Sequence, residues 1–356
     1  RHPPAIVEQF SIGADCASHD QGVALIVGRG IAPRFGEALQ LAPQRRVVGK
    51  PARSEQHARR RRKGLAAAAM LHDGTCDSAA LDRQVNQRSG VRWNASKAFL
   101  RPIQDRANLT VLTGVQVDQV LLDNTRARAV KALWQGAWHE FAARREIILC
   151  AGAVGSPGIL QRSGIGPRQL LESLGIGVRH DMPGVGGNLQ DHLQLRLIYQ
   201  IRNTRTLNQM ANSLWGKMGM GLRYLYDRSG PLSMAPSQLG AFARSGPEQT
   251  SANLEYHVQP LSLERFGEPL HAFPAFTASV CDLRPQSRGR IDIRSADPQQ
   301  APLIQPNYLS HPEDLRVAAD AIRLTRRIVA APALQPFKPL EYLPGAALQT
   351  EEQLHE

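Results

Sequence analysis

The sequence predicts a mixed α/β (α+β) fold with a two-domain organisation, on three observations. Its 356 residues leave room for roughly two domains and a sizeable core. An apolar run at residues 147–150 leads through small residues into a helix, and short alternating strands lie on both sides of it. Hydrophobic residues make up 42% of the chain and charged residues 21%, as is usual for a soluble globular protein.

The strand-to-helix passage carries the clearest ligand-binding pattern. After the apolar run, predicted to be a buried strand, the chain turns through Ala151, Gly152 and Ala153, which have little side-chain bulk. Ser156 stands where a helix N-cap is expected, and Pro157 suits the first helical position. Such a turn lets the backbone approach a flat or phosphorylated ligand, and helix N-termini favour anions. A tight connection without a ligand accounts for the local pattern equally well.

The first 83 residues give the weakest pattern. Residues 22–30 are the best strand candidate, and their glycines resemble a dinucleotide-binding fingerprint. Position 33 is Pro where the fingerprint needs Gly, so we predict no Rossmann loop there. A basic run from Arg59 to Lys63 resembles a nucleic-acid patch, but no aromatic residue lies within it to stack on bases.

Further along the chain, the hydrophobic pattern predicts strands and helices in order. We expect strands at residues 108–113, 117–122, 127–133 and 141–150, with turns at 123–125 and 135–136, then a helix at 167–174 that Gly175 ends. Strands are expected again at 253–258, at 276–282 and after the turn at 288–290. A helix at 310–329 should begin with a capping box of Ser310 and Glu313, with Pro312 in its first turn. Its apolar face should consist of Leu315, Ala318, Ala319, Ile322 and Val329.

Two sequence blocks resemble signatures of the glucose–methanol–choline (GMC) oxidoreductases, FAD-dependent enzymes that oxidise alcohols. Residues 152–166, GAVGSPGILQRSGIG, resemble the second signature of that family, and residues 185–192, VGGNLQDH, resemble the block that follows it. The resemblance covers about residues 84–356. It implies a partial FAD-binding, Rossmann-like domain at 84–192 and an antiparallel-sheet substrate domain at 193–356, while residues 1–83 stay unassigned.

The resemblance also implies the site residues. In the family, the residue matching Val117 contacts the adenine of FAD through its backbone. The implied cofactor-binding residues are Val117, Ala151, Gly152, Ala153, Ser156 and Asn188. Gln238 and His257 are the implied substrate-binding residues, and His192 is expected to support the site structurally. No catalytic residue is assigned, because no block matching the family's catalytic histidine occurs by Glu356.

The expected function is therefore oxidation of a primary alcohol to an aldehyde with FAD, of the choline dehydrogenase-like kind. The sequence names neither the alcohol nor the electron acceptor. Because the family's first signature and its catalytic block are both missing, we expect a fragment, truncated at both ends and inactive as given. An intact member that obtains its cofactor or its base from another chain remains an alternative.

Charge and cysteine spacing bear on partners and location. The net charge of +12 fits an anionic partner, so a basic nucleic-acid-binding module using the run from Arg59 to Lys63 is the alternative function. The excess is spread along the chain, and we expect no nucleic-acid partner. Four widely spaced cysteines predict neither a metal site nor a disulfide framework. Reduced thiols are the default for such cysteines, which predicts a cytoplasmic protein, with membrane association as an alternative. No apolar run approaches the ~20 residues of a membrane span.

Overall fold

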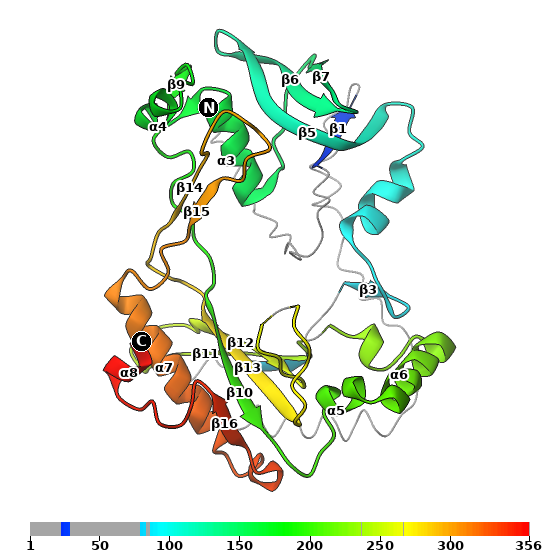
Figure 1. The fold of residues 1–356 in the computed structure, drawn as a ribbon, viewed down its shortest axis with the longest axis vertical. Coiled ribbons are helices and arrows are strands. Elements are labelled where there is room, and N and C mark those ends of the chain that lie inside the picture. The colour runs from blue at the N-terminus through cyan, green and yellow to red at the C-terminus, as the bar shows by residue number, and fades with distance from the viewer. Residues whose placement is uncertain (1–22, 29–78, 83–85, 236, 266, 356) are drawn as a thin grey trace. The chain divides into compact units, whose positions relative to one another are not determined.

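The structure is a computed structural model that describes residues 23–28, 79–82, 86–235, 237–265 and 267–355. The chain divides into two compact units (Figure 1). Of the described residues, unit 1 holds 23–28, 103–190 and 288–307, and unit 2 holds 79–82, 86–102, 191–235, 237–265, 267–287 and 308–355. The chain passes from unit 1 to unit 2 between residues 190 and 191, two residues before the domain boundary predicted after residue 192. The return of residues 288–307 to unit 1 was not predicted from the linear sequence.

Within the described residues, unit 1 contains a four-stranded antiparallel sheet in the order β1-β5-β6-β7. The strands are β1 (Val23–Gly28), β5 (Leu109–Asp123), β6 (Arg126–Trp134) and β7 (Ala137–Ala142). The expected strand within residues 22–30 is confirmed as β1. Both predicted turns are also confirmed, since Asn124, Gln135 and Gly136 take positive φ angles of 52°, 51° and 79°. The two strands expected at 108–113 and 117–122 are one continuous strand with a bulge after Val117.

The buried strand predicted at residues 147–150 is wrong. These residues form no regular element. Ile147 and Leu149 pack against a core cluster that includes Val115, Val130 and Ile159 of the sheet and helix, whereas Ile148 is 72% exposed. The alternation of an extended chain is thus present, but only one of its faces is covered by the described residues.

Helix α3 (Gly152–Arg162) follows and begins earlier than predicted. Its N-cap residue is Ala151, so the assignment of Ser156 as N-cap and Pro157 as first helical residue is wrong. Pro157 lies inside the helix, where its missing N–H deprives only the carbonyl of exposed Ala153 of a helical partner. Water can satisfy that carbonyl, which explains why the helix tolerates the proline near its start.

Unit 1 is completed by short elements around α3. The pair β8 (Ile165–Gly166) and β9 (His180–Asp181) is parallel and flanks α4 (Arg168–Ser173). Gly175 takes a φ of 69° just after α4, which confirms the predicted helix end. The strands β14 (Arg290–Asp292) and β15 (Leu303–Gln305) pair with one another, and β14 contacts α3.

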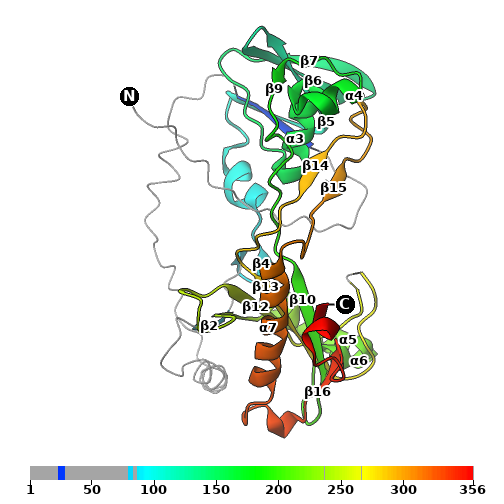
Figure 2. The ribbon, with the colours of Figure 1, turned by 90° about the vertical axis from the view of Figure 1, so that its left-hand side faces the viewer.

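Unit 2 is built on a six-stranded sheet in the order β16-β10-β13-β12-β11-β2, whose paired strands are antiparallel. The strands are β2 (Ala79–Asp82), β10 (Gln194–Gln200), β11 (Leu239–Ala243), β12 (Leu254–Gln259), β13 (Ala275–Asp282) and β16 (Leu340–Leu343). The expected strands at 253–258 and 276–282 are therefore confirmed. Helix α7 (Pro312–Val329) packs along one face of this sheet (Figure 2).

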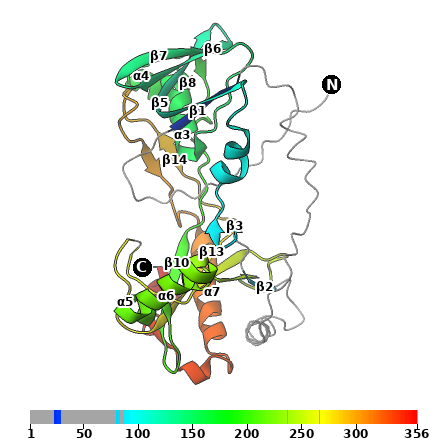
Figure 3. The ribbon, with the colours of Figure 1, turned by 90° about the vertical axis from the view of Figure 1, so that its right-hand side faces the viewer.

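The remaining elements of unit 2 are short. β3 (Gln87–Arg88) and β4 (Val91–Arg92) form a small hairpin ahead of the π-helical turn η1 (Ser96–Leu100) and of η2 (Arg101–Ile103), where the chain crosses to unit 1. α5 (Leu207–Asn212) and α6 (Leu214–Asp227) form a consecutive helical pair (Figure 3). The 3-10 turns η3 (Pro231–Ser233) and η4 (Gln335–Phe337) and the terminal helix α8 (Glu351–His355) complete the unit.

The helix expected at 310–329 is confirmed as α7, but its cap and its buried face differ from the prediction. His311 is the N-cap, and its Nδ1 accepts a hydrogen bond from the backbone N–H of Glu313 at 3.2 Å. The predicted capping box is wrong, because the Glu313 carboxylate pairs with Arg316 instead. The buried face is rotated toward Asp314, which accepts hydrogen bonds from the backbone N–H groups of Gln286 at 2.7 Å and Ser287 at 2.8 Å.

Among the described helices, none combines the length and the apolar character needed to cross a membrane. The basic run from Arg59 to Lys63 lies outside the described residues.

Candidate functional site

The position of α3 in unit 1 is set by contacts between its C-terminal end and β5. Ser163 accepts a hydrogen bond at Oγ from the backbone N–H of Val120 at 2.8 Å. Asp118, which bulges from β5 and is 4% exposed, lies 3.2 Å from Arg162 Nε and 3.3 Å from Lys131 Nζ. Burial lowers the pKa of Arg162, although the Asp118 carboxylate acts in the opposite direction. Removing either partner of so buried an ion pair would leave the other charge buried without a counter-ion. This contact therefore fixes α3 on the sheet.

The N-terminal end of α3 carries the predicted turn, and it is open. Gly152 has a φ of +77°, and a methyl group added there would meet no heavy atom within 4 Å. Gly152, Ala153 and Val154 are exposed. Because the first turn of a helix has no internal partner for its N–H groups, these donors face outward, and no acidic residue stands in that turn. The geometry suits a flat ligand or an anion close to the backbone.

A buried glutamine holds the Asn188 loop against the same helix. Gln161 is fully buried, and its Nε2 donates to the carbonyls of Ile291 at 3.1 Å and Val185 at 3.3 Å. Its Oε1 accepts from the backbone N–H of Ile293 at 2.9 Å. Gly186 is required here, since an added methyl group would lie 2.1 Å from the carbonyl oxygen of Ile291. No sequence pattern singles out Gln161 beyond its place within the family-like block 152–166.

The structure brings most of the predicted cofactor residues together. Val117 and Ala151 contact one core cluster, and the backbone N–H of Ala151 donates to Ser156 Oγ at 3.1 Å. Gly152 and Ala153 follow directly as the exposed turn. Asn188 is also exposed, with a φ of 57°, but its loop is tied to the opposite end of α3, about 16 Å along the helix by its length.

The predicted substrate residues lie in unit 2, on the sheet face opposite α7. Residues of β12 and β13 that point away from α7 are polar: Glu255, His257, Gln259, Thr277, Ser279 and Cys281. His257 is half-buried, and its Nε2 lies 3.3 Å from Glu255 Oε1. The residue opposite His257 on β11 is Gly240, so no side chain stands beside the imidazole on that strand. We call this surface the polar face.

Gln238 reaches the same polar face from the start of β11. Its backbone N–H donates to the carbonyl of Val258 at 3.1 Å, which extends the β11–β12 ladder by one residue. The register puts Gln238 diagonal to His257, a relation in which cross-strand side chains lie roughly 7–8 Å apart. The two predicted substrate residues therefore share one surface.

Of the polar-face residues, only His257 and Gln238 were predicted from the sequence; Glu255 and Cys281 are among those that were missed. Because side chains alternate along a strand, the strand predicted at 253–258 already puts Glu255 on the same face as His257. No local sequence pattern links Cys281 to either residue. His192, expected to have a supporting role, has its Nε2 3.3 Å from the carbonyl oxygen of Leu283 and so ties the start of β10 to the end of β13.

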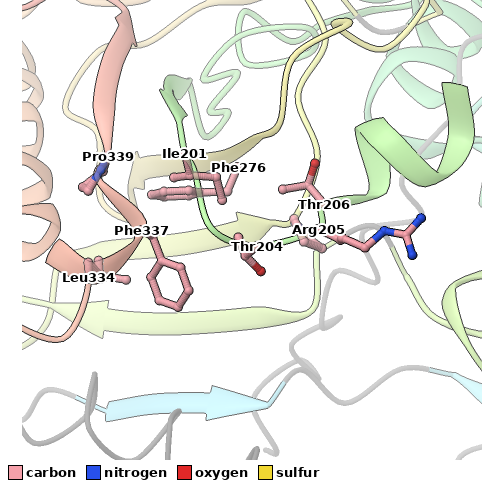
Figure 4. A pocket seen from close by; sticks show the side chains of 9 residues that line it. Ile201, Thr204, Arg205, Thr206, Phe276, Leu334, Phe337 and Pro339 are labelled. Carbon is pink, nitrogen blue, oxygen red and sulfur yellow. The ribbon is translucent and has the colours of Figure 1, made fainter.

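A cavity of about 240 Å³ lies elsewhere in unit 2, between the end of β10 and the segment around η4 (Figure 4). It is lined by Ile201, Thr204, Arg205, Thr206, Pro260, Phe276, Leu334, Phe337 and Pro339. Its walls are mainly apolar, and none of the predicted site residues lines it. We therefore treat the α3 turn of unit 1 and the polar face of unit 2 as two separate candidate sites, and not this cavity.

Comparison with known proteins shows the family of the chain. Two family profiles, both described as GMC oxidoreductase, match residues 53–194 and 285–356. The first match begins within the segment 1–83, for which the sequence had predicted no domain. Oxygen-dependent choline dehydrogenase of Pectobacterium atrosepticum is 40% identical over 277 residues, which is 78% of this chain and 49% of that protein. The corresponding protein of Pseudomonas putida is also 40% identical, over 77% of this chain and 48% of its own length.

Solved structures give the same result for the fold. Pyridoxine 4-oxidase from Mesorbium loti superposes with a TM-score of 0.69 at 26% identity, over 83% of this chain and 55% of that one. A formate oxidase superposes with a TM-score of 0.73 at 20% identity, over 84% of this chain and 57% of that one. The chain spans about half the length of the curated relatives it matches.

Proposed function

Because the chain belongs to the glucose–methanol–choline oxidoreductase family, we propose that it forms part of an FAD-dependent enzyme that oxidises the CH–OH group of a small primary alcohol. The observation that carries this proposal is the pair of family matches on both halves of the chain, together with the 40% identity to choline dehydrogenases. An alcohol of the choline class is the first substrate to test, since that is what these relatives are named for.

The exposed turn at the start of α3 fits a cofactor of this kind. FAD carries both a flat ring system and an anionic diphosphate, and it would supply the redox chemistry when bound. The open space at Gly152 leaves room for a ligand against the backbone, and the N–H groups of the first turn offer donors to it. Ala151 and Val117 would line this place from the core beneath. Asn188, whose loop is tied to the opposite end of α3, would contact a different part of so long a ligand.

The polar face fits the substrate side of the reaction. His257 can hold an alcohol hydroxyl by a hydrogen bond, and Glu255 orients the imidazole from its other side in the sheet. Gln238 adds an amide that can donate or accept. The nucleic-acid alternative is not retained, because residues 59–63 lie inside the range 53–194 that the family profile matches.

The proposed cofactor site is tested by changing Gly152→Ala and measuring FAD affinity through flavin fluorescence. A side chain at this positive φ costs roughly 1–2 kcal/mol of backbone strain and also occupies the space assigned to the ligand. Gly136→Ala is the matched control, since Gly136 has a φ of +79° and equally open surroundings but lies in the β6–β7 turn.

We expect the Gly152→Ala chain to bind FAD at least about tenfold more weakly than wild type, a difference of about 1.4 kcal/mol. The Gly136→Ala chain should bind as the wild type does, with a similar loss of stability. Equal FAD affinities for the two variants would show that the α3 turn does not contact the cofactor and would overturn the assignment.

A further inference from the structure

The polar face also brings together a group of side chains whose donor atoms suit a metal ion. His192, Glu255 and Cys281 each offer one ligand atom, and these three atoms lie within 4.8 Å of one another. The residues come from the approach to β10, from β12 and from β13, so the fold alone brings them together. Within the described part of the chain, this is the one group of three such side chains close enough to hold a metal ion.

The sheet register explains the convergence. Glu255 and Cys281 are directly paired across β12 and β13, which puts both side chains on the same face. Cys281 is also paired with Gln194 on β10, and His192 precedes Gln194 by two residues. Because side chains alternate along an extended chain, His192 falls on the face that holds the other two.

We propose that His192, Glu255 and Cys281 bind a zinc ion. A thiolate, an imidazole and a carboxylate form a donor set suited to Zn²⁺, and three protein ligands leave a fourth position open. Tetrahedral zinc with the usual bond lengths separates its ligand atoms by about 3.3–3.8 Å. The observed upper limit of 4.8 Å therefore requires an inward side-chain movement of about 1 Å, which rotation of exposed His192 can supply.

Neighbouring contacts already orient the ligands. With the hydrogen on Nε2, His192 donates to the carbonyl of Leu283 and presents Nδ1 to the metal, an arrangement common for zinc-binding histidines. The Glu255 carboxylate is held from its other side by His257. Cys281 is 2% exposed, and binding of the ion would release the thiol proton to solvent. This site is independent of the flavin, and its test needs neither FAD nor an alcohol.

The test uses Co²⁺ as a coloured substitute for Zn²⁺, added to the metal-free, reduced chain under anaerobic conditions. We expect a near-ultraviolet thiolate-to-cobalt charge-transfer band that saturates at one ion per chain and disappears when Zn²⁺ is added. Cys281→Ser should abolish the band, and His192→Gln and Glu255→Gln should each weaken binding at least about tenfold.

The matched control replaces the other cysteines together, as Cys16→Ser, Cys76→Ser and Cys150→Ser, which leaves Cys281 as the sole thiol. This variant should keep the full band. Far-ultraviolet circular dichroism checks whether Cys281→Ser still folds. If that variant does not fold, the metal affinity of His192→Gln, which changes only an exposed side chain, tests the proposed site instead. Absence of the band in the folded wild type, its survival in Cys281→Ser, or unchanged affinity in His192→Gln would overturn the proposal.

Discussion

Replacing Gln161 tests how the candidate cofactor site is held together. Its amide joins α3 to the Asn188 loop through Val185 and to β14 through the backbone of Ile291 and Ile293. The two shorter hydrogen bonds, at 3.1 and 2.9 Å, together contribute about 1–3 kcal/mol net. Gln161→Ala also leaves buried backbone groups without a partner and opens a cavity. We expect it to lower the free energy of unfolding by about 3–4 kcal/mol.

Gln161→Glu separates hydrogen bonding from packing, because it keeps the shape of the side chain. The acceptor toward Ile293 survives, but the donor toward two carbonyls becomes a second acceptor, so we expect a loss of about 2–4 kcal/mol at neutral pH. Protonation restores one donor, so this loss should shrink as the pH falls.

Urea unfolding of the wild type and of each variant measures these differences. Gln169→Ala, on the exposed face of α4 in the same unit, is the control and should stay within about 0.5 kcal/mol of wild type. A Gln161→Ala chain as stable as the control would refute the claim that this amide fixes the loop.

Two further predictions concern unit 2. Burial pushes the pKa of the Asp314 carboxyl up, but hydrogen bonds from Ser287 and Gln286 together hold it below its ordinary value. The ionised Asp314 carboxylate should therefore stabilise the fold fully above about pH 4, and this contribution should be lost as the pH falls through the lowered pKa. When the free energy of unfolding is measured from pH 2 to pH 6, that of Asp314→Asn should depend less on pH than that of the wild type. Arg326 contacts Glu341 in a bidentate pair at 2.8 and 2.9 Å and donates to the carbonyl of Leu348. Arg326→Lys should cost about 1–3 kcal/mol in urea unfolding while Arg327→Lys, at an exposed neighbour, should cost little.

Elements with strong local patterns were predictable from the sequence. The hairpin turns at Asn124 and Gly136 and the end of α4 at Gly175 follow from residues that accept positive φ. The existence of α7 follows from its 3.6-residue periodicity. These features depend on a few neighbouring residues, so no knowledge of the tertiary structure was needed.

The predictions from the sequence were wrong where contacts between side chains and the backbone of other segments or turns determine the structure. The pattern of α7 could not reveal that Asp314 is buried, because its partners at Gln286 and Ser287 belong to a distant segment. The start of α3 was misplaced because Ser156 bonds backward to Ala151 instead of capping the helix. Donor residues as far apart as His192 and Cys281 show no spacing motif, and only the register of β10, β12 and β13 brings them together.

The most direct test of the account is whether the folded 356-residue chain binds FAD. The chain is mixed with excess FAD, passed through a gel-filtration column, and examined for flavin absorbance in the protein peak. The account predicts flavin that elutes with the protein at up to one FAD per chain, and less of it with Gly152→Ala than with Gly136→Ala. A folded chain that elutes without flavin, and that shows no saturable change in flavin fluorescence, would contradict it.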